Sequence, residues 1–138
     1  DERIKRMAGK IDRVLIDAPC SGLGTLRRNP DLKWRQSPKA VEELQAKQAA
    51  ILDSAARLLK PGGRLVYATC SLLRAENEDI AEAFETQHSA HFERLDVAQL
   101  LVDARVDRAE GLVEQGCLRL WPQRHGTDGF FAAAWQRR

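Results

Sequence analysis

The sequence RVLIDAPCSG at residues 13–22 gives the first indication of the architecture, because a short run rich in β-branched residues is followed at once by a polar loop. Such a run is typical of a buried parallel strand. The sequence RLVYATCS at residues 64–71 repeats this arrangement, so that Cys20 and Cys70 each follow a predicted strand. Ligands and reacting groups gather at the carboxyl ends of strands in open α/β sheets. Two thiols at that edge, one of them close to Asp17, therefore indicate covalent chemistry more than packing.

A long amphipathic helix is predicted between these two strands. Residues 37–38 supply a serine N-cap and a proline at the first helical position, and apolar residues then recur at helical spacing as far as Leu59. The sequence KPGG at residues 60–63 is expected to end the helix and turn the chain. After the second strand, the acidic run at residues 76–79 predicts the start of another helix that continues to about Gln87.

The remaining elements complete a fold prediction. A strand is expected at residues 92–95, a mixed helix and loop segment at 97–114, and two further strands at 117–121 and 130–135, joined by a turn at 126–129. This order predicts an α/β fold, namely the C-terminal half of a doubly wound, mostly parallel sheet that ends in an antiparallel strand pair. No glycine-rich turn stands between an early strand and a helix, so the half that would hold a nucleotide-like cofactor is not predicted in this chain.

Composition limits the class of protein. The 138 residues are enough for one domain, and 43% hydrophobic with 30% charged residues is ordinary for a globular protein. No apolar run approaches the roughly 20 residues that span a bilayer, and three widely spaced cysteines are a poor disulfide framework. We therefore expect a cytoplasmic protein without a membrane partner. Because the chain does not begin with methionine, we also expect it to be part of a larger protein.

A basic segment follows the first strand. The net charge of +2 is too small to indicate a nucleic-acid partner by itself, but four cations and one tryptophan fall within nine residues. These residues are Arg27, Arg28, Lys33, Trp34 and Arg35. Cations that contact phosphates and an aromatic ring that stacks on bases suit single-stranded RNA. The segment therefore predicts RNA contact, with a solvated face and a tryptophan packed under the loop as the alternative.

Three ordered motifs resemble those of RNA 5-methylcytosine methyltransferases. DAPCSGLGT at residues 17–25, with RNPDLKW at 28–34, is similar to the fourth motif of that family. YATCS at 67–71 is similar to the sixth motif, and HGTDGFF at 125–131 resembles the C-terminal signature. The closest likeness is to the bacterial Sun-type group, the ribosomal RNA small-subunit methyltransferases B.

The resemblance implies a Rossmann-like methyltransferase fold that uses S-adenosyl-L-methionine and acts on RNA, most closely small-subunit ribosomal RNA. The family's glycine-rich cofactor motif has no counterpart in this sequence. Residues 1–138 therefore correspond to the C-terminal part of a single methyltransferase domain, and the isolated chain is expected to be inactive. Transfer RNA is the alternative substrate.

The chemistry of cytosine explains why thiols are needed. Carbon 5 is a weak nucleophile, and addition of a thiolate to carbon 6 activates it, which is covalent catalysis. A base must later remove the carbon 5 proton so that the thiol can leave. Spacing alone does not show which cysteine attacks, and in DNA cytosine-5 enzymes the Pro-Cys thiol does. The resemblance to the RNA family implies Cys70 as nucleophile, Cys20 in adduct release, and Asp17 in contact with the base and the cofactor.

Other interpretations use the same residues. A cysteine is often a packing residue, and we expect Cys117 to be one. We also expect the two phenylalanines at residues 130–131 to lie in the core rather than to stack on a base. A zinc site with His88 and His91 is disfavoured because no Cys-x-x-Cys pair exists, so we expect no metal. The main competing function is a non-catalytic RNA-binding or ribosome-assembly module of the same fold. Such a module would need neither Cys20 nor Cys70.

Overall fold

The computed structural model describes residues 2–26, 28–31, 34 and 36–138. Its strands are β1 (Ile11–Asp17), β2 (Leu59–Thr69), β3 (Phe92–Arg94), β4 (Val113–Glu114), β5 (Cys117–Leu120) and β6 (Phe130–Arg137). Its α-helices are α1 (Glu2–Arg6), α3 (Pro38–Ala56), α4 (Glu78–His88), α5 (Val97–Asp103) and α6 (Pro122–His125). Three 3₁₀ turns are η1 (Leu23–Thr25), η2 (Arg74–Glu76) and η3 (Ala109–Leu112).

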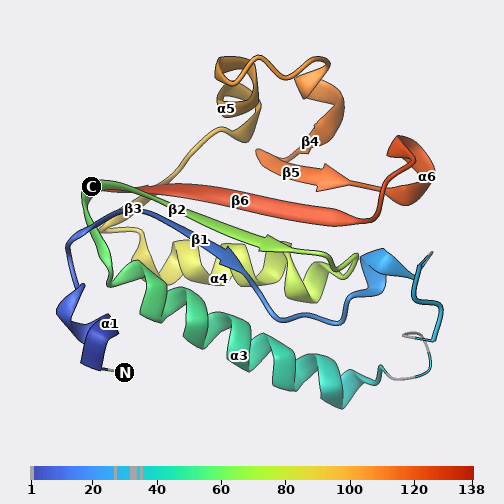
Figure 1. Cartoon of the computed structure of the whole chain (residues 1–138), viewed down its shortest axis with the longest axis horizontal. Coiled ribbons are helices and arrows are strands. Elements are labelled where there is room, and N and C mark those ends of the chain that lie inside the picture. The colour runs from blue at the N-terminus through green and yellow to red at the C-terminus, as the bar shows by residue number, and fades with distance from the viewer. Residues whose placement is uncertain (1, 27, 32–33, 35) are drawn as a thin grey trace.

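The described strands form one sheet in the order β1-β2-β6-β5-β4, with β3 paired to β6 at one end. Figure 1 shows α3 and α4 together on one side of this sheet. β1 and β2 are parallel, and the other described pairings are antiparallel. The predicted final strand pair is confirmed as β5 and β6. Because β6 inserts between β2 and β5, the last strand is central to the sheet.

The predicted start of α3 is confirmed. Ser37 caps the helix, its Oγ accepting a hydrogen bond of 3.1 Å from the Ala40 amide, and Pro38 occupies the first turn. Neither α3 nor any other helix in the described part of the chain is long and apolar enough to cross a membrane.

The predicted end of this helix is wrong by three residues. The helix ends at Ala56, and Leu59 already belongs to β2, where it pairs with Ile11. The register then shifts, so that Arg13 pairs with Arg64. Residues 60–63 therefore form a bulge within the strand instead of a separate turn, and Gly62 takes the left-handed conformation, with φ of 85°, that such a bulge favours.

The acidic run that was expected to open α4 is divided in the structure. Glu78 and Asp79 lie in the first turn of the helix, as predicted. Glu76 does not, because it lies in η2 and is completely buried. The prediction for Glu76 is therefore wrong, and its carboxylate has a different role, described below.

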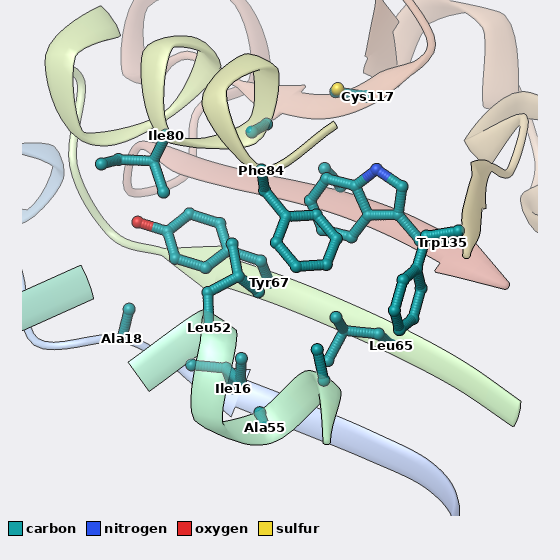
Figure 2. Packing of buried hydrophobic residues seen from close by; sticks show 14 of the residues in the cluster. Ile16, Ala18, Leu52, Ala55, Leu65, Tyr67, Ile80, Phe84, Cys117 and Trp135 are labelled. Atoms are coloured by element: carbon teal, nitrogen blue, oxygen red, sulfur yellow. The ribbon is translucent and has the colours of Figure 1, made fainter. Parts of the chain in front are cut away.

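The core lies between the sheet and the two helices on its covered side. Figure 2 shows Leu52 of α3 and Phe84 of α4 pointing toward Tyr67 and Trp135 on the central strands. The ring centroids of Phe84 and Trp135 are 4.9 Å apart. Burial of these large apolar side chains is the main source of folding free energy.

The core contains two of the three residues that were predicted to pack in it, Cys117 and Phe131. Cys117 is buried in the same cluster, which confirms its predicted packing position, and its Sγ also accepts a hydrogen bond of 2.7 Å from Arg94. Burial raises the pKa of the Cys117 thiol. Phe131 is fully buried, as predicted, whereas Phe130 is only half-buried.

Candidate active site

β1 and β2 deliver Cys20 and Cys70 to the same edge of the sheet. The parallel pairing continues past the end of β1, since the Ala18 amide donates a hydrogen bond of 2.9 Å to the Ala68 carbonyl. The two Sγ atoms lie 3.4 Å apart, and both side chains are free thiols that remain partly exposed. The structure therefore brings together the two cysteines that the sequence placed after separate strands.

The two thiols differ in their acidity. The hydrogen bond between the two sulfurs is the largest influence on the pair, and it lowers the pKa of Cys70 to about 7. Partial burial and the negative charges of Asp17 and Glu76 act in the opposite direction on Cys70. The same hydrogen bond, together with burial, raises the pKa of Cys20 well above its ordinary range. Near neutral pH the pair therefore favours a Cys70 thiolate that accepts a hydrogen bond from a protonated Cys20.

Asp17 is the last residue of β1 and sits opposite Ala68 in the register with β2. Its side chain is exposed, and its charge acts on the Cys70 thiol. A carboxylate is therefore present at the same edge as the two thiols, on the side that a ligand can reach.

The buried carboxylate of Glu76, which the sequence did not predict, joins the loops that follow the two cysteines. One oxygen of Glu76 accepts hydrogen bonds of 2.9 Å from the Ser21 amide and 2.9 Å from the side-chain amide of Gln48. The other oxygen accepts a bond of 2.5 Å from the Ser71 hydroxyl. Ser21 and Ser71 directly follow Cys20 and Cys70. The only signal in the sequence was an amide side chain, Gln48, among the apolar positions of a predicted helix.

Further buried hydrogen bonds fix the loop after Cys70. The Thr69 hydroxyl donates to Asn77 Oδ1 at 2.5 Å, and Asn77 Nδ2 donates to the Ser71 carbonyl at 2.9 Å. The Tyr67 hydroxyl donates to the Glu76 carbonyl at 2.7 Å, and burial raises the pKa of this phenol. Buried polar groups that are satisfied in this way make a loop rigid.

Two glycines connect the thiol pair to the start of β6. The Gly24 amide donates a hydrogen bond of 2.8 Å to the Cys70 carbonyl, and the Gly129 amide donates one of 2.7 Å to the Gly24 carbonyl. A Cβ atom on Gly24 would lie 2.6 Å from the Gly129 carbonyl oxygen and closer still to that of Cys70. The turn at residues 126–129 therefore also contacts the loop after Cys20, through the hydrogen bond from Gly129 to Gly24.

The basic segment is only partly described. Arg28 forms an ion pair of 2.6 Å with Asp128, and Trp34 is 80% exposed. The other predicted RNA contacts, Arg27, Lys33 and Arg35, lie outside the described residues.

The histidines named as possible metal ligands have other surroundings. His88 Nε2 lies 2.9 Å from a carboxylate oxygen of Asp53, and the His88 ring stacks on Phe84 with centroids 4.4 Å apart. His91 is exposed. In the described residues no group of three or more His, Cys, Asp or Glu side chains is arranged to hold a metal ion.

Comparison with known proteins gives consistent matches. Residues 1–136 match the family described as 16S rRNA methyltransferase RsmB/F. A probable ribosomal RNA small subunit methyltransferase B from Synechocystis is 44% identical over 131 residues, which cover 89% of this chain and 26% of that protein. The chain spans about a quarter of the length of the curated relatives it matches.

Two solved structures from Pyrococcus horikoshii are also similar, each with 26% sequence identity. NSun6 with SFG superposes with a TM-score of 0.74, covering 98% of this chain and 32% of its own. A methyltransferase homolog protein superposes with a TM-score of 0.72, covering 99% of this chain and 42% of its own. These matches confirm the predicted Rossmann-like α/β methyltransferase fold.

Proposed function

Because the chain belongs to the RsmB/F family of 16S rRNA methyltransferases, we propose that it carries the thiol pair of an enzyme that methylates carbon 5 of cytosine in small-subunit ribosomal RNA. The observation that carries the proposal is the 3.4 Å contact between the Cys20 and Cys70 sulfurs at the ends of two parallel strands. A thiol whose pKa is lowered to about 7 is a nucleophile at neutral pH, which a packing cysteine is not.

In the first half of the reaction the Cys70 thiolate adds to carbon 6 of the cytosine ring. The ring electrons then move toward carbon 5, which becomes nucleophilic enough to accept a methyl group. Asp17, at the same edge, acts as the acid: its carboxyl group gives a proton to N3 as the thiolate adds, so the negative charge that addition would place on the ring is neutralised. This proton transfer makes the carbon 6 adduct more stable than it would be in water.

In the second half Cys20 removes the proton from carbon 5, and Cys70 leaves carbon 6 as the double bond forms again. The geometry explains the timing of this step. The pKa of Cys20 is raised mainly because its thiol donates to the Cys70 sulfur. Once that sulfur is bound to carbon 6 it carries no negative charge, so the main reason for the high pKa of Cys20 is removed. Cys20 can therefore lose its own proton to solvent only after the adduct exists, and the thiolate so formed is the base that takes the carbon 5 proton.

S-adenosyl-L-methionine supplies the methyl group in this proposal, and a similar solved structure contains its analogue SFG. Among the described residues, Asp17 fits a contact with this cofactor, because its exposed carboxylate ends β1 and can accept a hydrogen bond. We propose that residues 1–138 are the C-terminal part of one methyltransferase domain, whose N-terminal part supplies most of the cofactor site.

RNA would approach over the basic segment. Arg28 and the exposed Trp34 are suited to phosphate contact and base stacking, and Arg27, Lys33 and Arg35 add positive charge in the same segment. The segment follows the Cys20 loop in the sequence, and we propose RNA as the partner of a cytoplasmic enzyme.

The decisive experiment traps the covalent adduct in the full-length protein. RNA containing 5-fluorocytidine should form an adduct that is resistant to denaturation, since the proton that Cys20 removes is replaced by fluorine. Cys70→Ala should abolish both adduct and methylation. With ordinary RNA, Cys20→Ala should accumulate the adduct, because addition can occur but release cannot. Cys117→Ala is the matched control, as its thiol is buried in the core and should leave trapping intact.

The outcomes separate the alternatives. An adduct that forms with Cys70→Ala and not with Cys20→Ala would reverse the two roles. Folded protein that binds RNA but forms no adduct would favour the non-catalytic RNA-binding or assembly module. A covalent adduct that forms preferentially with transfer RNA would show that transfer RNA, and not ribosomal RNA, is the substrate.

A further inference from the structure

We propose that Glu76 is a positioning residue that holds the two cysteine loops together, so that the Cys20 thiol can donate its hydrogen bond to the Cys70 sulfur. The inference rests on the proposed roles of the two cysteines and assigns a function to a residue that touches neither sulfur through a hydrogen bond. Its basis is the arrangement of donors around one buried carboxylate.

The carboxylate joins the two loops at equivalent places. It is 0% exposed, and its two oxygens accept hydrogen bonds from Ser21 and Ser71, the residues that directly follow the two cysteines. The hydroxyl oxygens of these serines lie 3.3 Å apart, so the loops are also in contact with each other. A change in the position of the carboxylate would therefore move both cysteine loops at once.

A third donor fixes the carboxylate to the helical layer. Gln48 on α3 donates to Glu76 at 2.9 Å and to the Pro19 carbonyl, just before Cys20, at 2.8 Å. A buried carboxylate is expensive unless donors surround it, and hydrogen bonds to an ionised acceptor are stronger than neutral ones. Packing alone would be served at lower cost by an apolar side chain. The set of donors is explained if the carboxylate is needed to define the loop geometry.

Two opposite effects on Cys70 make this proposal testable. The charges of Asp17 and Glu76 both raise the pKa of Cys70, whereas the hydrogen bond from Cys20 lowers it. If Glu76 acted only as a nearby charge, its neutralisation would lower the pKa of Cys70. If it holds the loops together, its loss separates the sulfurs and raises that pKa toward the ordinary value. The two models predict shifts of opposite sign.

The experiment measures the rate of Cys70 alkylation by iodoacetamide against pH, with mass spectrometry to identify the modified cysteine. The midpoint for the unaltered protein is expected at about 7. Glu76→Gln keeps the shape of the side chain, and we expect its midpoint to rise by about one pH unit, with roughly tenfold slower alkylation below the midpoint. Glu85→Gln is the matched control, because Glu85 lies on α4, is partly buried, and binds Arg94 and Trp135 instead of the cysteine loops. Its midpoint should not move.

An unchanged or lower midpoint in Glu76→Gln would overturn the proposal. Should that variant fail to fold, Ser71→Ala removes the link between the carboxylate and the Cys70 loop, together with the contacts of the Ser71 hydroxyl to Ser21 and the Leu73 amide. The absence of an upward shift there would overturn the proposal equally. The measurement needs neither RNA nor cofactor. An upward shift in a protein that forms no RNA adduct would therefore leave the positioning role in place while refuting the proposed methylation.

Discussion

At the scale of single residues, the thiol pair depends on a glycine, Gly24, as well as on charged residues. Gly24 is pressed between the backbone of the Cys70 loop and that of Gly129, with hydrogen bonds on both sides. Both neighbours of a new Cβ would be main-chain carbonyl groups, which cannot move aside as the end of a flexible side chain can. The position therefore tolerates glycine alone without a shift of the loop.

Gly24→Ala should lower the free energy of unfolding by about 1–3 kcal/mol, the usual range for overpacking a filled site. Urea denaturation followed by circular dichroism measures this. Gly111→Ala is the control, since a Cβ at Gly111 meets nothing within 4 Å. If the two variants were equally stable, the contact between Gly24 and the Cys70 loop would not be tight in solution.

The sequence was informative for residues whose role follows from their place at a strand end. Cys20, Cys70 and Asp17 could be grouped because parallel strands bring their carboxyl ends to one edge. Glu76 could not be identified, because an acid just before a helix has the same local pattern whether it lies in solvent or is buried. Glu76 is buried because Ser21 in the loop after β1 and Gln48 on α3 donate hydrogen bonds to its carboxylate, and both residues are distant from Glu76 in the sequence.

At the scale of elements, α3 determines where the buried amide of Gln48 lies, so the start of this helix matters to the site. Ser37→Ala removes the side-chain cap and should cost about 1 kcal/mol of stability. Thermal or urea unfolding measures this. Ser54→Ala, at an exposed position near the end of α3, should be neutral or slightly stabilising because alanine is the better helix former. A loss of equal size in both variants would show that the cap contributes nothing.

Element types followed from the sequence more readily than element boundaries. The apolar runs of β1 and β2 and the capped start of α3 have local causes. The end of α3 does not, because Leu59 leaves the helix in order to pair with Ile11 in another strand. Proline and glycine at 61–63 were typical of a turn, and only the partner strand shows that they form a bulge.

At the scale of the whole molecule, β6 connects most of the sheet. It pairs with β2, β3 and β5, and its Trp135 is fully buried and donates a hydrogen bond of 3.0 Å to Glu85 on α4. One side chain therefore links the central strand to the helical layer. Loss of its ring should weaken the entire fold as one unit.

Trp135→Ala should lower the free energy of unfolding by roughly 3–5 kcal/mol, a large part of the total for a domain of this size. Circular dichroism in urea is suitable because it does not rely on the deleted fluorophore. Val102→Ala removes apolar atoms from a side chain that is 56% exposed, and should change stability by less than about 0.5 kcal/mol. Similar losses in both variants would argue against an organising role for β6.

The insertion of β6 between β2 and β5 also has a consequence for biosynthesis. A ribosome makes β6 after every strand that it joins, so the facing edges of β2 and β5 stay open until residues 130–137 emerge. Open strand edges invite pairing with other chains, which makes the growing polypeptide most vulnerable to aggregation at this stage. The contact from Gly129 to Gly24 forms equally late. The last contact of the Cys20 loop is thus made only after the rest of the site has been synthesised.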